Sequence, residues 1–338
     1  MKIIYSTDHV LHEPGLEFNS GQMMEIPEVS ERITEIYYFL KKEKKIQVEF
    51  VDMKSFNDSW ILEVHSTDYY EFLQTPQDDL VINVPCVFPK PGLDHFGTND
   101  PVANLGRYFF DTGVPLWEES FPAIKSAIDC SLTGAELLTK GDRYCYALIR
   151  PPGHHAASNY GGGYCYLNNA AVAANYLSKK SKVTVLDIDF HHGNGTQQIF
   201  YETSKVQYVS LHASPQWAYP YYSGYRDEIG KGEGKGYNLN FPLVEDIRPK
   251  EYLKVLDDAC KAIISYRPDY LVLSAGYDII FGDPAGYFNI KPEIFRKIGS
   301  KIASLDLPVL IIQEGGYDPS ENIRCVKNLI DALEKNDE

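Results

Sequence analysis

The second half of the chain carries four apolar runs, which predict buried strands at Cys145–Ile149, Val183–Ile188, Leu271–Ser274 and Val309–Ile312. Short, continuous apolar runs are typical of strands that are buried on both faces of a parallel sheet. Residues at helical spacing separate the runs, as in Ala170–Leu177 and Tyr252–Ile264. This alternation predicts an α/β protein whose parallel sheet carries helices on both faces.

The first half of the chain is less regular. Ile3–Ser6 predicts a short opening strand, and Ile46–Val51 predicts another. Between them, apolar residues at helical spacing predict an amphipathic helix from about Pro27 to Glu43. Pro76–Pro115 is weakly periodic and rich in Pro, Gly and Asp, so we expect a long functional or flexible loop insertion there. The chain shows no internal repeats, and we expect one catalytic domain over residues 1–338.

A polar, glycine-rich segment follows each of the four buried runs. The first run leads into Arg150–His155 and the second into Asp187–Gly195. The third leads to Asp278 and the fourth to Glu314–Tyr317. In open α/β sheets, ligands bind in the crevice at the carboxyl ends of the strands. The four segments are therefore expected to meet at one edge of one sheet and to form one site.

Metal-ligand chemistry is the first candidate at this edge. Asp187, Asp189 and His191 alternate at a spacing of two, which places them on one side of extended backbone. Asp189 and His191, together with Asp278, make a three-ligand site that leaves one position open for water. Zinc suits these nitrogen and oxygen ligands, although iron or cobalt could use them too. Aspartates at strand ends can also cap helices, but that alternative does not account for His191 or Asp278.

Acid–base and oxyanion chemistry are the second candidate. His154 and His155 follow two prolines and a glycine, and histidine titrates near neutrality, so either ring could move a proton. Asp187 and Asn194 are candidate partners that would fix a histidine tautomer. Tyr317 follows two glycines and could donate to a developing oxyanion. A packing role for the histidines and an ordinary turn for the tyrosine are the alternatives.

Composition narrows the class of protein. The chain of 338 residues is 44% hydrophobic and 23% charged, as expected of a globular enzyme. Its net charge of −15 argues against a nucleic-acid surface and is compatible with a cationic substrate, or simply with solubility. Six cysteines without a C-x-x-C pair favour reduced thiols and a cytoplasmic location. We expect neither a signal peptide nor a membrane span.

Five motifs occur along the chain: RPPGHHA, GGYCYLNNAA, DIDFHHGNGTQ, SAGYD and QEGGY. Together they resemble the histone deacetylase superfamily, and RPPGHH with HHGNG resembles its class II branch. The N-terminal YSTDH, Glu17 and a helix that contains Arg32 are similar to acetylpolyamine amidohydrolases. The resemblance covers nearly the whole chain. It implies an arginase–deacetylase fold around an eight-stranded parallel sheet, and a zinc-dependent amidohydrolase that removes an acetyl group from an amine.

The resemblance also implies a role for each matched residue. One zinc ion per chain would be held by Asp189, His191 and Asp278. His155 would be the general base and acid, paired with Asn194, whereas His154 would be an electrostatic partner, paired with Asp187. The acyl carbonyl would be polarised by Tyr317.

Further residues match the substrate tunnel and the potassium sites of the superfamily. Tyr164 and Tyr219 would form opposite walls of a tunnel, and Glu17 would lie near its mouth, where a carboxylate favours a cationic amine tail. Structural potassium would be bound at two sites, which match Asp187, Ser210 and Leu211, and Phe200, Thr203 and Val206. Pro76–Pro115 resembles an insertion that narrows the tunnel and supports a homodimer.

The substrate is the least determined part of the prediction. We expect a small cationic acetylated amine, with a second acidic selector among Asp94, Asp111, Glu118 and Glu119. An acetyl-lysine peptide deacetylase with the same site is the main alternative. An arginase-like enzyme with two manganese ions would need additional metal ligands, and the third segment offers Asp278 and then only Asp283. A non-catalytic binding protein should have lost one of the matched residues, and none is missing. The glycine-rich segment 230–236 lacks the spacing of a phosphate-binding loop.

Overall fold

The computed structural model describes residues 1–19, 21–75, 84–89, 98 and 100–334. Its centre is an eight-stranded parallel sheet in the order β4-β1-β5-β10-β9-β6-β7-β8. These strands span Lys2–Tyr5 (β1), Glu49–Asp52 (β4), Tyr144–Ala147 (β5), Val183–Asp187 (β6), Val206–Ala213 (β7), Asn238–Leu243 (β8), Tyr270–Ala275 (β9) and Val309–Gln313 (β10). A separate antiparallel hairpin joins β2 (Leu16–Asn19) to β3 (Gln22–Glu25). The predicted sheet is confirmed.

The α-helices span Glu31–Lys42 (α1), Ser59–Leu62 (α2), Thr67–Gln74 (α3), Pro101–Tyr108 (α4), Ser120–Thr139 (α5), Asn169–Ser178 (α6), Asn194–Phe200 (α7), Pro249–Tyr266 (α8), Ile294–Ala303 (α9) and Pro319–Glu334 (α10). Two short 3-10 helices occur at Thr7–Leu11 and Gly232–Gly234. Within the described ranges, no helix is both long enough and apolar enough to span a membrane.

Helices cover both faces of the sheet because successive strand residues point to opposite sides. Ile3 belongs to a core that contains buried residues of α1, α8, α9 and α10. Its neighbour Ile4 belongs to a second core, with residues of α5 and α6. Ile311 and Ile312 divide between the two cores in the same way. The uninterrupted apolar runs of the sequence reflect this burial on both faces.

The structure differs from the sequence prediction in its less apolar elements. The predicted Pro76–Pro115 loop contains the helix α4, which is a correction: Asp100 caps it by accepting the Ala103 N–H at 2.9 Å, and Pro101 suits its first turn. Most of the remainder of that segment lies outside the described residues. The predicted helix starts at Glu31 rather than Pro27, and the second strand starts at Glu49 rather than Ile46. Polar residues interrupt the apolar runs of β7 and β8, so these two strands were not predicted from the pattern.

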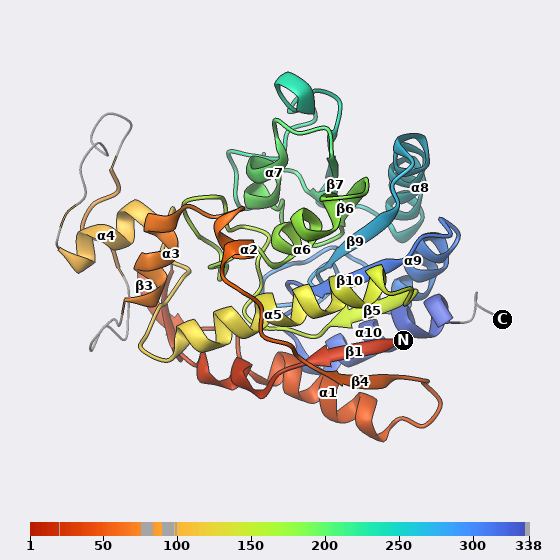
Figure 1. Cartoon of the computed structure of the whole chain (residues 1–338), viewed down its shortest axis with the longest axis horizontal. Helices are drawn as coiled ribbons and strands as arrows, with labels where there is room; N and C mark the ends of the chain where they lie inside the picture. Colours follow the sequence, from red (N-terminus) through yellow and green to blue (C-terminus); the bar gives the residue numbers. More distant parts are fainter. Residues whose placement is uncertain (20, 76–83, 90–97, 99, 335–338) are drawn as a thin grey trace.

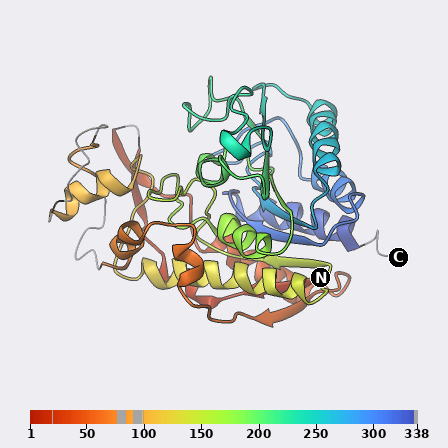
Figure 2. The same ribbon diagram turned by 45° about the horizontal axis from the view of Figure 1, so that its top comes forward.

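Figure 1 shows α4 and the β2–β3 hairpin standing apart from the sheet at one end of the molecule. At the opposite end, the first strand begins beside the end of α10, as Figures 1 and 2 both show. There the Met1 ammonium donates a hydrogen bond to Glu334 at 2.9 Å. The carboxyl ends of the strands therefore face away from the chain start, toward the hairpin and α4.

Candidate metal centre and active site

Three side chains from two strand ends meet at the carboxyl edge of the sheet. Asp189 and His191 follow β6, and Asp278 follows β9, the neighbouring strand. One donor atom from each lies within 4.8 Å of the other two. His191 Nδ1 is 3.3 Å from Asp189 Oδ1 and 3.1 Å from Asp278 Oδ2. The structure thus brings together the three residues that the spacing predicted as ligands.

Backbone N–H groups fix the two carboxylates. Asp189 Oδ2 accepts a hydrogen bond from the Gly315 N–H at 2.8 Å. Asp278 Oδ1 accepts one from the Phe190 N–H at 3.0 Å. The other oxygen of each carboxylate is left facing His191. This division of oxygens leaves three donor atoms, one from each residue, close enough to share one cation.

The charge of this group fits a divalent cation. Both aspartates are fully buried, and burial, followed by the charge of Asp189, raises the pKa of Asp278 to about 7. Burial disfavours a charged His191, but hydrogen bonds to Asp189 and Asp278 outweigh it and raise its pKa to about 9. Two repelling carboxylates with one imidazole make a nitrogen–oxygen set that suits zinc. The described residues hold one such group.

The two neighbouring histidines have different partners and different basicity. His155 Nδ1 is 2.7 Å from Asn194 Oδ1, and His154 Nδ1 is 3.1 Å from Asp187 Oδ2. Burial, with the nearby charge of His154, lowers the pKa of His155 well below its usual 6.5. Burial acts in the same direction on His154, but the Asp189 and Asp187 carboxylates outweigh it and raise its pKa to about 10. The pair therefore combines a neutral imidazole with a charged one.

Tyr317 is held by a buried arginine. The guanidinium carbon of Arg32 lies 4.5 Å from the centre of the Tyr317 ring, and its Nε donates to the Gly316 carbonyl at 2.6 Å. The Tyr317 N–H donates to Asp283 Oδ2 at 2.6 Å. Burial raises the pKa of Tyr317 well above 10. The phenol is thus fixed in its protonated form, as a hydrogen-bond donor must be.

The sequence analysis missed the ion cluster that anchors this arginine. Glu28, Arg32 and Arg150 are all fully buried. Glu28 Oε1 accepts hydrogen bonds from Arg32 Nη1 at 2.5 Å and from Arg150 Nε at 2.8 Å. A buried charge needs such partners. The one available signal was the spacing of four between Glu28 and Arg32 at the start of a helix.

Two tyrosines flank the histidines and the phenol, as expected for Tyr164 and Tyr219. The Tyr219 ring stands edge-on to His155, with ring centres 5.0 Å apart. The Tyr164 ring likewise stands edge-on to Tyr317, with ring centres 5.6 Å apart. Gly163 makes the close approach possible, because a Cβ there would lie 2.6 Å from the His155 ring and 2.9 Å from the Tyr219 hydroxyl. Tyr164 itself has a φ of 65°, a strained conformation that is often found at functional sites.

Each of these tyrosines binds a carboxylate. The Tyr219 hydroxyl donates to Asp111, whose Oδ2 also accepts the Gly163 N–H at 3.0 Å. The Tyr164 hydroxyl bonds to Glu17, which lies on β2 and is buried rather than exposed. Burial raises the pKa of both carboxyl groups.

Asp111 is therefore the best placed of the four predicted acidic selectors. Glu118 and Glu119 are exposed where α5 begins. Asp94 lies outside the described residues.

The residues predicted to bind potassium lie around β6 and β7. Asp187 pairs with Ser210 across these strands, and Leu211 follows in β7. The Thr203 N–H donates to the Phe200 carbonyl at 3.2 Å, between the end of α7 and Val206, where β7 begins. Each predicted set is close together in the fold, and the two potassium sites stay predictions.

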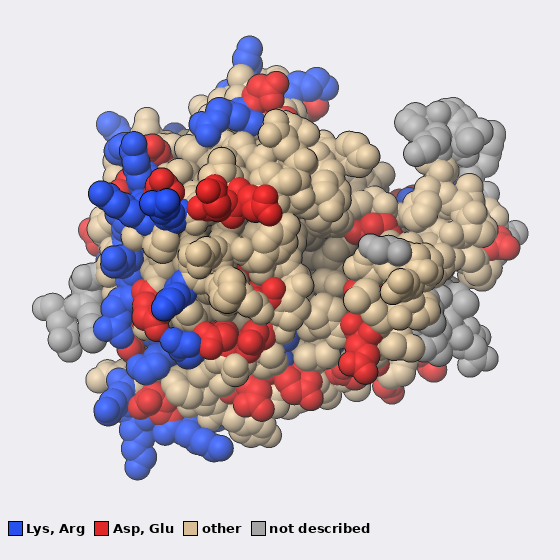
Figure 3. All heavy atoms as spheres, turned by 180° about the vertical axis from the view of Figure 1, so that it is seen from behind, with Lys and Arg blue, Asp and Glu red and all other residues tan. Residues whose placement is uncertain are grey.

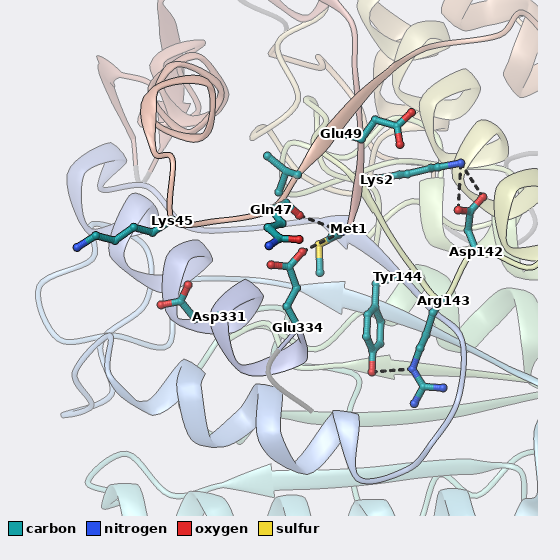
Figure 4. Close-up of a pocket in the computed structure, with 11 residues that line it drawn as sticks. Met1, Lys2, Lys45, Gln47, Glu49, Asp142, Arg143, Tyr144, Asp331 and Glu334 are labelled. Atoms are coloured by element: carbon teal, nitrogen blue, oxygen red, sulfur yellow. Dashed lines mark hydrogen bonds and ion pairs between the residues drawn. The ribbon is translucent and has the colours of Figure 1, made fainter. Parts of the chain in front are cut away.

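A second polar pocket lies at the amino ends of the strands (Figure 4). Its charged side chains bind one another, as in the pairs Met1–Glu334 and Lys2–Asp142. The Arg143 guanidinium likewise donates to the Tyr144 hydroxyl at 3.2 Å. These groups tie the chain start to the end of α10. The chemistry that the motifs predicted lies at the opposite edge of the sheet.

The donor set and the neighbouring histidine pair, at the carboxyl edge of the sheet, are those of a metal-dependent hydrolase. Residues 26–333 match the family model for the histone deacetylase domain, so the chain belongs to the histone deacetylase family. The family resemblance drawn from the motifs is confirmed.

Several relatives are similar over nearly their full length. The chain is 38% identical to acetylpolyamine amidohydrolase 1 of Pseudomonas aeruginosa over 327 residues, which is 94% of each chain. It is 34% identical to the acetylpolyamine amidohydrolase of Mycoplana ramosa, covering 98% of this chain and 99% of that one. The crystal structure of the acetylpolyamine aminohydrolase from Burkholderia pseudomallei superposes with a TM-score of 0.91 at 32% identity, covering 98% of both chains. The HDA15 HD domain superposes with a TM-score of 0.82 at 26% identity, covering 98% of this chain and 90% of that one.

Proposed function

We propose that the protein is a zinc-dependent amidohydrolase that removes the acetyl group from acetylpolyamines or similar small cationic acetyl-amines. The observation that carries the proposal is the convergence of Asp189, His191 and Asp278 beside His155 and Tyr317. Acetylpolyamine amidohydrolases among the near full-length relatives support the choice of substrate.

Asp189, His191 and Asp278 would hold one zinc ion per chain, and iron or cobalt are the alternatives. A bound ion supplies Lewis-acid polarisation of the acyl carbonyl and lowers the pKa of water. The protein supplies the dry, fixed surroundings: the two aspartates are fully buried and held by backbone N–H groups.

His155 is suited to accept a proton from the attacking water. With Nδ1 directed at Asn194 Oδ1, its tautomer leaves Nε2 free as a base, and its lowered pKa keeps the ring neutral. The same ring can return the proton to the leaving amine. The charged His154, paired with Asp187, stabilises negative charge that develops nearby.

Tyr317 is suited to stabilise the oxyanion that forms as the water adds to the carbonyl. Its phenol is held by the contact with Arg32 and stays protonated, so it can donate a hydrogen bond to the developing charge. Gly315, two residues before it, allows the chain to approach Asp189 closely, because a Cβ there would lie 2.6 Å from an oxygen of that side chain.

Acidic groups around the site support a cationic substrate. Glu17 bonds to the Tyr164 hydroxyl and Asp111 to the Tyr219 hydroxyl, so each of the two flanking tyrosines has a carboxylate beside it. Figure 3 shows Asp and Glu side chains around a hollow in the surface, whereas Lys and Arg gather along the opposite edge of that face. A field of this sign attracts cations.

A panel of substrates tests the proposal. Purified protein should contain one zinc per chain and should hydrolyse acetylputrescine, acetylcadaverine or acetylspermidine faster than acetyl-lysine peptides. A clear preference for the peptides would replace the polyamine proposal by the acetyl-lysine deacetylase, which the match to the histone deacetylase domain keeps as the second candidate. Metal-free protein with full activity would overturn both.

Four further assignments are part of this proposal. We propose structural potassium at the two predicted sites, where Asp187 and Ser210 face each other across β6 and β7. We also propose a homodimer, a cytoplasmic location and a single catalytic domain over residues 1–338. Size-exclusion chromatography with light scattering tests the dimer, and thermal stability in potassium against sodium buffers tests the cation.

A further inference from the structure

The carboxylate of Glu314 is a buried group to which the proposed mechanism gives no role. Glu314 follows β10 directly and is fully buried. Its Oε2 accepts hydrogen bonds from the backbone N–H groups of Gly153 at 2.7 Å and His154 at 3.1 Å. Its Oε1 accepts one from the Ser274 hydroxyl of β9 at 3.1 Å. One side chain therefore joins the loop of the two histidines to two central strands.

Proline chemistry explains why these two N–H groups matter. Pro151 and Pro152 have no backbone N–H, so Gly153 and His154 carry the first donors of the loop. Both residues are buried, and a buried N–H without an acceptor costs about 1–3 kcal/mol. A Cβ at Gly153 would lie 2.6 Å from the Asn169 backbone nitrogen, so the loop has no room to relax around a larger residue.

The opposite side of the loop is held through a carbonyl group. The His154 carbonyl accepts hydrogen bonds from the N–H groups of Gly195 and Thr196, each at 3.1 Å, in the first turn of α7. The same turn begins with Asn194, the partner of His155. Glu314 on one side and α7 on the other thus fix the position of the loop that carries both imidazole rings.

We propose that Glu314 is a positioning residue for His154 and His155 that acts through the backbone of their loop. The inference rests on the proposed amide hydrolysis, for which His155 must stay aligned with the open side of the metal ligands. All three hydrogen bonds of the Glu314 carboxylate in the described structure come from neutral donors. The charge of His154 also attracts this carboxylate. Burying a carboxylate is costly even so, and a packing role alone would be served better by an apolar residue.

Two substitutions separate the hydrogen bonds from the charge. Glu314→Gln keeps an oxygen that can accept both N–H groups and an amide that can donate to Ser274, so kcat should stay within about threefold of wild type. Glu314→Ala leaves both N–H groups without an acceptor. A displacement of about 1 Å can cost about 10²-fold, so we expect that loss in kcat with little change in the KM for acetylspermidine.

Asp129→Ala is a matched control for the loss of a buried carboxylate. Asp129 lies on α5, is 3% exposed, accepts the Phe56 N–H at 3.1 Å and pairs with Lys125 at 2.7 Å, and these partners lie outside the loop of the two histidines. This variant should lower the Tm as Glu314→Ala does, while its kcat stays that of wild type. If Glu314→Ala keeps the wild-type kcat, or if Asp129→Ala loses as much kcat, the positioning role is wrong.

Backbone amide exchange gives a readout that needs no turnover. Hydrogen–deuterium exchange in segment 150–156 should be slow in wild type and Glu314→Gln and at least about tenfold faster in Glu314→Ala. Unchanged exchange in Glu314→Ala overturns the inference even where acetylspermidine is hydrolysed. Faster exchange in Glu314→Ala, together with no hydrolysis of any acetyl-amine by wild type, supports the positioning role of Glu314 and rejects the proposed function instead.

Discussion

The site has a floor and an outer wall that are built differently. The floor consists of Asp189, His191, Asp278, His155 and Tyr317, and the wall consists of Glu17, Asp111, Tyr164 and Tyr219. Every floor residue follows one of the adjacent strands β5, β10, β9 and β6. The wall residues come from segments outside the sheet and are joined by tyrosine–carboxylate hydrogen bonds. The comparison indicates that the sheet determines the chemistry, whereas the surrounding segments determine which amine can enter.

The largest expected effect comes from removing one floor charge. Asp278→Asn keeps the shape of the side chain but removes one of the two buried carboxylates, so zinc should bind much more weakly. We expect kcat/KM to fall by about 10³-fold or more, equivalent to about 4 kcal/mol of transition-state stabilisation. Kinetics with acetylspermidine and metal analysis of the same preparation measure both losses.

Glu49→Gln is the control for that experiment. Glu49 begins β4 and lines the polar pocket at the amino ends of the strands (Figure 4). It belongs to the same sheet but lies at the opposite edge from the floor. Its activity and zinc content should equal those of wild type. If Asp278→Asn also kept its zinc and its rate, the floor would not be a metal site.

The second-largest effect is expected from removing the hydroxyl of Tyr317. Tyr317→Phe keeps the ring that Arg32 contacts but removes the hydroxyl, so the fold should be unchanged. Losing one oxyanion donor should lower kcat by about 10²-fold, with a small effect on KM. A near-normal kcat would restrict Tyr317 to a packing role and would leave the oxyanion to other groups.

The floor could be predicted from the sequence because its signal is local. Asp189 and His191 alternate directly after an apolar run, and strand ends of a parallel sheet meet at one edge. The wall could not be predicted in the same way. Tyr219 and Asp111 are separated by 108 residues, and their contact depends on how two segments outside the sheet pack. Similarly, β7 was missed because buried Gln207, Ser210 and His212 interrupt its apolar pattern.

The third prediction concerns the wall. Glu17→Gln and Asp111→Asn keep acceptors for the Tyr164 and Tyr219 hydroxyls but remove negative charge. Each should raise the KM for acetylspermidine by about tenfold, which corresponds to about 1.4 kcal/mol, with kcat nearly unchanged. The KM for a neutral acetyl-amide such as N-butylacetamide is the control and should not change. An equal rise for both substrates would show that these carboxylates shape the wall without selecting charge.

The same preference should depend on pH. Burial raises the pKa of Glu17 above its usual value, and burial also raises that of Asp111. Each group is neutral below its raised pKa and negative above it, so attraction for a cation is gained as the pH rises. The KM for acetylspermidine should therefore fall as the pH rises through these raised pKa values, while that for the neutral amide stays constant. If the KM fell equally for both substrates, the pH dependence would come from the floor residues instead.

The smallest expected effect on turnover concerns the segment that connects floor and wall. Residues 156–163 connect His155 to Tyr164, and the buried side chain of His65 bonds to this segment. His65 Nδ1 donates to the Ala157 carbonyl at 2.9 Å, and its Nε2 accepts the Asn168 N–H at 3.0 Å. These two bonds require the neutral ring. Burial lowers the pKa of His65 to about 4, although the bond to Ala157 opposes the shift.

Protonation of His65 should therefore destabilise the fold without changing the catalytic groups. Between the unfolded pKa of about 6.5 and the folded pKa of about 4, the unfolded chain binds the proton, so stability falls as the pH falls. His65→Gln should be less stable than wild type at pH 7.5, but the gap should narrow by about 1.5 kcal/mol between pH 6.5 and pH 5. Urea unfolding at these pH values measures the gap, and kcat at pH 7.5 should stay within about twofold of wild type. A constant gap would mean that His65 has the same pKa in the folded and the unfolded protein. A large loss of kcat would mean that the connecting segment takes part in aligning the floor.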